Sequence, residues 1–398
     1  MNKKISLGAA IAFMAVVASI TFVITMLFSQ GVFNKMISNV SQRESMYEKI
    51  QEIDKLVRNN YLFELDEDAL KDEMASGLIN GLEDPYAAYL DQEEYERDLL
   101  ESKGELVGIG IQASVDPTNG YMTVVSIYDG APAAESGLQV GDIIVKIDGK
   151  DVAEVGATEA IKMISGEPGT KVTVTVRRDA VDTDYTLQRK QVEIPSIVSR
   201  MIDTNCYIKI TEFNANTPEQ FKKAIETAQK NGAKGLIFDL RGNGGGNMDA
   251  VTEMLDYLLP SGNIVTQTDA KGETTVLATS DDSQVSMPMI TLTNGKTASA
   301  SELFVADLKD YGKAQSVGTT TYGKGVMQTT YALSDGSAIR LTTGYFNPAK
   351  SDNFNGVGIA PDYEVTLTAE QEQNFATLDE TTDPQLKKAI EVINSQVQ

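Results

Sequence analysis

The segment "GLIFDLRGNGGGNMDAV", residues 235–251, runs from an apolar stretch through a glycine-rich turn into an amphipathic stretch. We predict a strand, a turn and a helix, an order that leaves backbone N–H groups free to bind an anion. A dinucleotide fingerprint would need glycine where Asn247 stands, and a P-loop would need Gly-Lys-Ser/Thr. The remaining interpretation is an oxyanion hole, made by the amide of Gly245 or Gly246 together with that of Ala300.

The same alternation extends on both sides of this segment. The runs "CYIKITEF" (206–213) and "MPMITLTN" (287–294) are typical of strands, and "TPEQFKKAIETAQKNG" (217–232) and "SELFVADLKDYG" (301–312) of helices. Strands that alternate with helices predict an α/β layered core from about residue 193 to 367.

The composition excludes several classes of function. The 398 residues hold 34 basic and 57 acidic side chains, a net charge of −23 that would repel nucleic acid, so we expect no nucleic-acid partner. The single cysteine, Cys206, allows no intrachain disulfide. Because the chain has no histidine, it can form no Ser-His pair, and a zinc site would lack its commonest ligand. We expect no metal and no cofactor.

Two serines in "NGKTASASE", residues 294–302, are candidate nucleophiles. Ser299 precedes a predicted helix, where the helix dipole and free N–H groups favour a nucleophile. Ser299 and Glu302 also fit a capping box, in which the serine would only cap the N-terminus of the helix. The spacing does not separate these two interpretations.

Lys324 is the candidate base, because lysine can replace histidine once its pKa falls. Lowering that pKa from about 10.4 to about 7 takes roughly 4 to 5 kcal/mol, which burial supplies. Lys324 lies between two glycines in "TTYGKGVMQTTYAL", with no other charge from Thr319 to Ser334. Gln328 would share its face in a strand and orient the amine. The alternative is a solvated hairpin lysine.

The N-terminal residues predict a membrane segment or a secretory signal. Residues 5–28 are uncharged and mostly apolar and follow Lys3 and Lys4. This stretch is long enough for a transmembrane anchor. The basic residues place the N-terminus in the cytoplasm, so in either case we expect the remaining chain to be extracytoplasmic. We assign residues 1–30 to this segment.

Two further segments precede the α/β core. Residues 41–100 have the periodicity of helices, as in "MYEKIQEIDKLVRNNYLF" (46–63). Residues 101–185 change to short strands and turn glycines, and "APAAESGLQVGDIIVKIDG" (131–149) resembles a bacterial PDZ domain. A PDZ domain captures C-terminal tails as an added strand. The turn that would bind the terminal carboxylate comprises Gly108, Ile109, Gly110 and Ile111. The alternative is that these glycines only make a tight turn.

Several motifs together resemble the carboxyl-terminal processing peptidases, Ser-Lys proteases with an inserted PDZ domain. They are "NGKTASASE", "YGKG" with Gln328 downstream, "DLRGNGGG", "GLEDPYAAYL" (81–90) and "GVGIAPDYEV" (356–365). The resemblance implies that Ser299 is the nucleophile, Lys324 the general base and Gln328 its orienting partner, with Ser301 a helix residue. It implies a crotonase-like α/β protease core over 186–370. The amphipathic run "DPQLKKAIEVINSQVQ" (383–398) separately predicts a helical tail, which we assign to residues 371–398.

The implied function is a serine endopeptidase that cuts extracytoplasmic proteins near their C-termini, with the PDZ domain holding the substrate tail. The alternative is a catalytically silent PDZ-bearing membrane scaffold. The chain departs from the family at Gly244, where relatives often have proline, and at Ser165, where some carry an arginine that couples ligand to active site. The helical arm and the tail indicate a homodimer.

Overall fold

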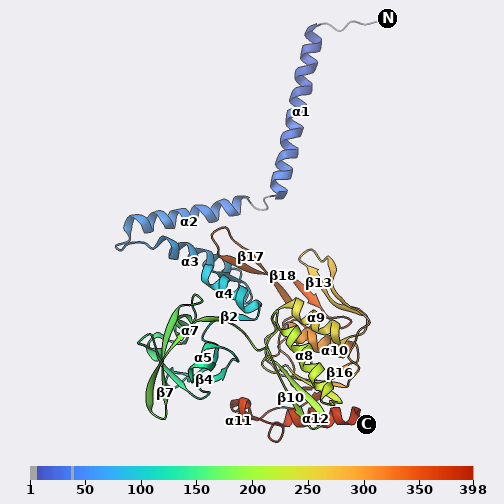
Figure 1. The fold of residues 1–398 in the computed structure, drawn as a ribbon. Coiled ribbons are helices and arrows are strands. Elements are labelled where there is room, and N and C mark those ends of the chain that lie inside the picture. The colour runs from blue at the N-terminus through green and yellow to red at the C-terminus, as the bar shows by residue number, and fades with distance from the viewer. Residues whose placement is uncertain (1–6, 37–39, 398) are drawn as a thin grey trace. The chain divides into compact units, whose positions relative to one another are not determined.

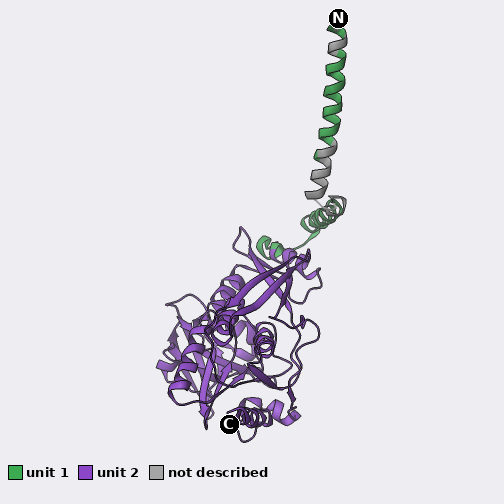
Figure 2. Cartoon of the chain, turned by 90° about the vertical axis from the view of Figure 1, so that its right-hand side faces the viewer, with its two compact units in different colours: residues 1–71 green, residues 72–398 purple. Residues whose placement is uncertain are grey.

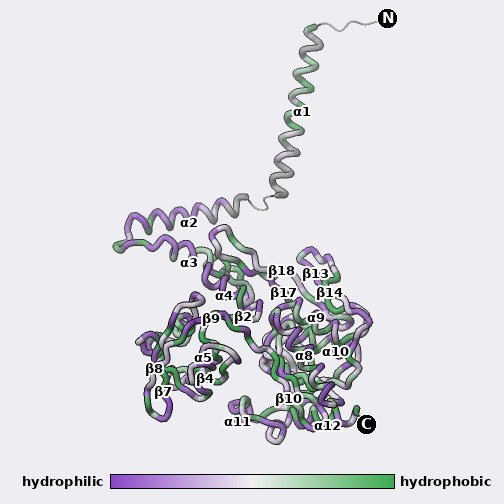
Figure 3. The backbone as a smooth tube through the Cα atoms, viewed as in Figure 1, coloured by the Kyte–Doolittle hydropathy of each residue, from purple (hydrophilic) through white to green (hydrophobic). Residues whose placement is uncertain are grey.

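The computed structural model describes residues 7–36 and 40–397, in two compact units, residues 1–71 and 72–398 (Figure 2). The first unit holds α1 (Leu7–Met36), the mostly hydrophilic α2 (Val40–Asn60; Figure 3) and the start of α3 (Glu67–Asn80). Among the described residues, no helix combines the length and apolar character needed to cross a membrane. The predicted anchor over 1–30 is therefore not confirmed, and residues 1–6 of it lie outside the described part.

The helical segment predicted over 41–100 contains α2, α3 and α4 (Gln92–Ser102), but it also contains a strand that the sequence analysis missed. This strand, β1 (Ala88–Leu90), pairs with β18 (Ala338–Asn347). The Asp91 carboxylate caps α4 by accepting from the Glu94 N–H at 2.8 Å, and so starts the helix directly after the strand. The segment therefore supplies a strand to the sheet that contains β18, in addition to its helices.

The next segment folds into a small antiparallel sheet in the order β3-β4-β5-β7-β8, which leaves β3 at an edge. Its core combines alternate apolar residues of these strands, such as Val172, Val174 and Val176, which are all buried. The segment's last long strand reaches Gln188. The elements are β2 (Glu105–Gly108), β3 (Ile111–Val115), β4 (Met122–Ile127), α5 (Pro132–Ser136), β5 (Ile143–Ile147), β6 (Lys150–Asp151), α6 (Val152–Val155), α7 (Ala157–Ile164), β7 (Lys171–Arg178), β8 (Val181–Gln188) and β9 (Lys190–Glu193).

The α/β core is built on a sheet in the order β10-β11-β12-β15-β16-β19, parallel from β11 onward. Its helices α8, α9 and α10 lie side by side (Figure 1). The bounds are β10 (Ile197–Ile202), β11 (Asn205–Ile210), α8 (Thr217–Lys230), β12 (Gly235–Asp239), α9 (Met248–Leu258), β15 (Met289–Thr293), α10 (Ala300–Asp310), β16 (Ala314–Gly318) and β19 (Tyr363–Glu364).

Strand β12 is buried throughout because both faces of the sheet are covered. Leu236 and Phe238 pack in the cluster that includes α8, α9 and α10, whereas Ile237 packs in a second cluster with α12 (Pro384–Gln396). The apolar run at 236–238 is explained by this double covering. The C-terminal tail thus buries its apolar side within the same chain.

A second, antiparallel sheet contains β17, the strand that directly follows the loop with Lys324. Its order is β1-β18-β13-β14, with β17 paired to β18. The remaining bounds are β13 (Gly262–Asp269), β14 (Thr274–Ser280), β17 (Val326–Ala332), α11 (Ala369–Gln373) and the 3-10 turn η1 (Phe375–Thr377).

Candidate active site

Ser299 lies between β15 and α10, where it is the N-cap residue of the helix. Its backbone has φ 58° and ψ −120°, a left-handed conformation that a side chain with a Cβ rarely adopts and that costs roughly 1 to 3 kcal/mol. The predicted capping residue Glu302 accepts a hydrogen bond from the Ser299 N–H at 2.9 Å. Ser299 is half-buried and lines a pocket, so its hydroxyl is placed where a substrate can reach it.

Ser301 has a different environment. It is fully buried in α10, and its Oγ has no hydrogen-bond partner among the described residues. Of the two candidate serines, only Ser299 lines the pocket.

Lys324 lies in the loop before β17 and is half-buried. Burial lowers the pKa of its amine, and the Arg340 guanidinium lowers it further, whereas Asp84 acts in the opposite direction. The Nζ lies 4.5 Å from the centre of the Tyr86 ring, a contact that no sequence pattern predicts. The hydrogen bonds of the described residues include none between Lys324 Nζ and Ser299 Oγ.

One buried side chain brings the serine and lysine segments together. The backbone nitrogens of Ser299 and Lys324 both lie within hydrogen-bond distance of Glu302 Oε2, at 2.9 and 2.8 Å. The other oxygen, Oε1, accepts from Thr321 Oγ1 at 2.5 Å and from the Gly323 N–H at 2.7 Å. The two sequence-predicted residues, 25 positions apart, are therefore neighbours in the fold.

The glycine-rich turn packs directly against Ser299. A Cβ on Gly245 would lie 2.8 Å from Ala298 O and 2.9 Å from Ser299 Cβ, so only glycine fits there. The Gly245 N–H already donates to Asn243 Oδ1 at 2.8 Å. The amides of Gly246 and Ala300 donate to no backbone acceptor in the described part of the chain, and they remain the candidate oxyanion donors.

The predicted strand face shared by Lys324 and Gln328 is wrong. Strand β17 begins at Val326, so Lys324 is in the preceding loop, and a register shift falls between Met327 and Gln328. The Gln328 Nε2 donates to Thr342 Oγ1 at 3.2 Å. Gln328 nevertheless lines the same pocket as Lys324 and Ser299.

The pocket has a volume of about 520 Å³ and a mixed lining. Acidic side chains come from α4 and the end of β11, and burial raises the pKa of both Glu101 and Glu212. Asp98 pairs with Arg340 at 2.6 Å across the same pocket. Its apolar lining residues are Phe213, Met248, Val326, Met327 and Phe346. Ser299, Lys324 and Gln328 all lie in the lining of this one cleft.

In the small sheet, the predicted peptide-binding turn Gly108–Ile111 connects β2 to β3. Gly110 has φ +74°, and the carbonyl groups of Ile109 and Gly110 accept from Ala133 and Tyr128 at 2.9 and 3.0 Å. The turn therefore leads directly into the edge strand β3, whose open side suits an added peptide strand.

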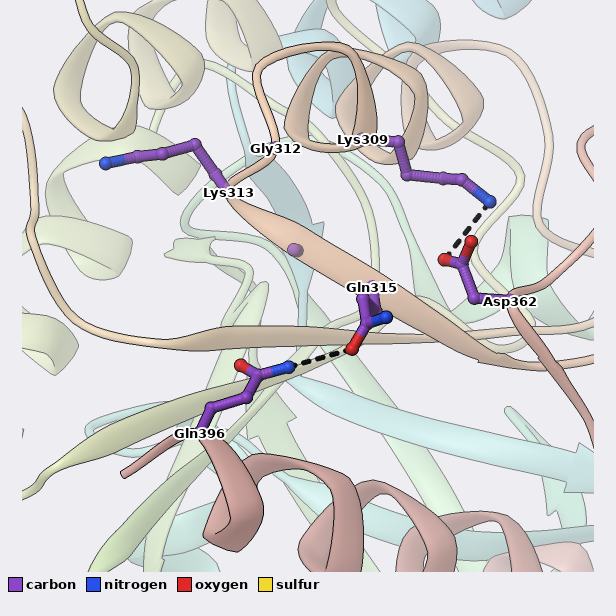
Figure 4. Close-up of a pocket in the computed structure, with 7 residues that line it drawn as sticks. Lys309, Gly312, Lys313, Gln315, Asp362 and Gln396 are labelled. Atoms are coloured by element: carbon purple, nitrogen blue, oxygen red, sulfur yellow. Dashed lines mark hydrogen bonds and ion pairs between the residues drawn. The ribbon is translucent and has the colours of Figure 1, made fainter. Parts of the chain in front are cut away.

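A second hollow of about 420 Å³ lies near the end of α10, and Ser299 is not among its lining residues (Figure 4). Four of its polar side chains form two pairs: Lys309 contacts Asp362 at 3.2 Å, and Gln396 donates to Gln315 at 2.9 Å (Figure 4). Within residues 7–36 and 40–397, no group of three or more His, Cys, Asp or Glu side chains is placed to hold a metal ion.

Comparison with known proteins gives matches to three family descriptions. Peptidase family S41 matches residues 204–365, a PDZ domain matches 123–178, and the N-terminal domain of the activating protease CtpB matches 7–94. The PDZ match thus covers the small sheet from β4 to β7, and the peptidase match covers most of the α/β core.

Whole-chain relatives agree. The chain is 32% identical over 332 residues to the carboxy-terminal processing protease CtpA of Bacillus subtilis, covering 83% of this chain and 71% of that protein. It is 31% identical over 345 residues to a probable CtpA-like serine protease of Staphylococcus aureus, covering 86% and 69%. The fold is similar to that of a putative S41 protease from Bacteroides fragilis, with a TM-score of 0.55 and 15% identity over 85% of this chain and 93% of that one.

Proposed function

This chain belongs to peptidase family S41, as a CtpA-like carboxy-terminal processing protease with a PDZ domain, and on that premise we propose that Ser299 and Lys324 form its catalytic dyad. The observation that carries the proposal is the shared anchoring of the two residues on Glu302 Oε2, at the edge of one pocket. Membership of a peptidase family gives no support to the alternative of a silent scaffold.

The proposed reaction is acyl transfer to serine followed by hydrolysis. The neutral Lys324 amine accepts the Ser299 hydroxyl proton while Oγ forms a bond to the scissile carbonyl carbon. The amides of Gly246 and Ala300 stabilise the oxyanion, and each such donor contributes about 2.7 to 4 kcal/mol. The lysine then gives its proton to the leaving amine, and the C–N bond breaks. A water, deprotonated by the same amine, then attacks the acyl carbon. The bond from that carbon to Oγ breaks, and the protonated lysine returns the proton to Oγ, which restores Ser299.

Gln328 is proposed to orient the Lys324 amine during this cycle. Its place in the lining of the shared pocket supports the role, and its present bond to Thr342 Oγ1 must then be exchanged for one to the amine. A Gln328→Ala variant should lose activity without losing stability, because the Gln328 side chain is only partly buried.

The PDZ domain is proposed to hold the C-terminal tail of a protein substrate. The tail would extend the sheet at β3, with its carboxylate at the turn Gly108–Ile111. Substrates would then be cut near their C-termini, because the PDZ domain would hold the end of the substrate chain. A peptide amidated at its C-terminus should bind more weakly than the free acid, which isothermal titration calorimetry can measure.

The dyad is tested with the purified protein and unfolded casein. We expect Ser299→Ala and Lys324→Ala each to reduce cleavage by at least about 1,000-fold. The control is Ser301→Ala, which should retain most of its activity because Ser301 is buried outside the pocket. Cleavage at the native rate by either dyad variant would disprove the assignment.

An extracytoplasmic location is proposed from Lys3, Lys4 and the uncharged residues that follow them, an order found in secretory signals. Digestion of the protein by protease added to spheroplasts would support export, and full protection would contradict it.

A homodimer through the helical arm is also proposed. Light scattering that shows only monomer at micromolar concentrations would contradict it.

A further inference from the structure

Glu302 is a buried carboxylate whose partners are all hydrogen-bond donors. Its side chain belongs to a residue with no exposed surface, and it forms no ion pair among the described residues. Burying a carboxylate is costly unless other groups replace the lost water. Here three backbone N–H groups and one hydroxyl do so, two at each oxygen. Such an arrangement is more than a helix cap needs, since a cap uses only the Ser299 N–H.

The donors come from the two segments that carry the proposed dyad. The Ser299 N–H is held in a strained left-handed conformation, which persists only when the surroundings fix it. The other donors lie in residues 321–324, which we call the base loop: they are Thr321, Gly323 and Lys324. The side chain of Glu302 is thus the direct link between nucleophile and base.

The base loop is also fixed from its far side. Thr321 Oγ1 accepts from the Ile359 N–H at 2.7 Å while it donates to Glu302. Gly323 has φ +90°, and a Cβ there would lie 2.8 Å from the Gly358 nitrogen. The loop therefore has little conformational freedom as long as Glu302 holds it, and the backbone of Lys324 is fixed in position.

We infer that Glu302 is a positioning residue of the protease, which sets the separation of the Ser299 hydroxyl and the Lys324 amine by holding both backbone segments on one carboxylate. The inference rests on the proposed dyad. It assigns Glu302 no proton transfer and no contact with substrate. Both oxygens are needed, because each accepts two hydrogen bonds.

The decisive variant is Glu302→Gln, which has nearly the same shape but only one acceptor oxygen. Its amide NH₂ would face two donors, either the Ser299 and Lys324 N–H groups or the Thr321 and Gly323 pair. The matched control is Asp307→Asn, also a buried acid on α10. The Asp307 carboxyl contacts the Ala349 N–H at 2.8 Å rather than the base loop, and burial raises its pKa to about 8. An amide therefore resembles its protonated form.

The experiment measures kcat, KM and thermal unfolding for the full chain with a peptide substrate. We expect Glu302→Gln to lose at least about 100-fold in kcat with KM changed less than about threefold, because misplacing the dyad affects chemistry more than binding. Asp307→Asn should keep kcat within about twofold. A folded Glu302→Gln variant with native kcat would overturn the inference, as would an equal loss of kcat in Asp307→Asn.

A second variant covers failure to fold. Glu302→Asp keeps the charge and both acceptors but is one methylene shorter, so it should unfold cooperatively with kcat at least about tenfold lower. Native kcat in this variant would also overturn the inference. Ser299→Ala and Lys324→Ala are measured in parallel: if they are inactive while Glu302→Gln is active, the dyad stands and only the role of Glu302 fails.

Discussion

The environment of Lys324 shows that local desolvation can prevail over the charge of the whole chain. A net charge of −23 favours protonated lysine, yet burial and Arg340 lower the pKa of this amine. Distant acidic groups are screened by solvent and salt, whereas the lost hydration acts at the amine itself. A single half-buried position can therefore hold an amine with a lowered pKa in a protein that has no histidine.

Replacing Arg340 should change the pH dependence of cleavage. Because Arg340 lowers the pKa of Lys324, Arg340→Gln should raise it and leave Asp98 unpaired nearby. The base is active when neutral, so the acidic limb of kcat/KM should move to higher pH. The rate at pH 7 should fall by up to about tenfold.

Arg177→Gln is the control for this change, since Arg177 forms an exposed ion pair with Asp182 in the PDZ domain. In Arg177→Gln, the pH dependence of kcat/KM measured by peptide cleavage should be unchanged. A profile that moves to lower pH in Arg340→Gln would contradict the assignment of Lys324 as the base.

At the scale of elements, the glycine-rich turn contains two adjacent glycines whose surroundings differ sharply. Gly245 has φ +103° and packs against Ser299, whereas a Cβ on its neighbour Gly244 would meet nothing within 4 Å. Gly245→Ala should therefore displace Ser299 and lower kcat by at least about 100-fold. Peptide cleavage by the purified variant measures this loss.

The paired change Gly244→Ala should be tolerated and should raise the free energy of unfolding by about 0.4 to 1 kcal/mol, through lower entropy of the unfolded chain. Urea unfolding measures this. Equal effects of the two substitutions would show that the turn does not position the nucleophile.

The sequence predicted this turn and both serines because they lie in local patterns of strand, turn and helix, and it predicted the lysine because no other charge lies nearby in the chain. It did not predict the Tyr86 ring beside Lys324, because the two residues are far apart in the chain. Nor did it predict the second role of Glu302, since its capping pattern was complete without the base loop. The error at Gln328 arose from assuming an unbroken strand, whereas β17 starts after Lys324 and carries a register shift.

At the scale of the whole molecule, the C-terminal helix is tied to the active-site turn. Arg241, at the start of that turn, contacts Asp239 at 2.6 Å and Asp383 at 2.7 Å, and all three side chains are buried. Asp383 also caps α12. The predicted alternation of strands and helices gave the core, but periodicity alone could not show that the tail covers the second face of the sheet, because such packing depends on tertiary contacts.

Removing Asp383 should therefore destabilise the protein through both contacts. We expect Asp383→Ala to lower the free energy of unfolding by about 2 to 4 kcal/mol, because Arg241 loses one of its two carboxylate partners and α12 loses its cap, while Asp239 still pairs with Arg241. Asp383→Asn keeps the helix cap and should cost about 1 kcal/mol less. Urea denaturation of both variants measures the difference, and a change below about 1 kcal/mol in Asp383→Ala would contradict this role of the tail.

The most direct test of the dyad is the rate at which a fluorophosphonate labels Ser299 as a function of pH, followed by mass spectrometry. In the native protein we predict a tenfold rise per pH unit to a plateau, with a midpoint below the ordinary lysine pKa of 10.5. In Lys324→Met we predict labelling at least about 100-fold slower, without that limb. Equal rates and identical pH profiles in the two proteins would contradict the account.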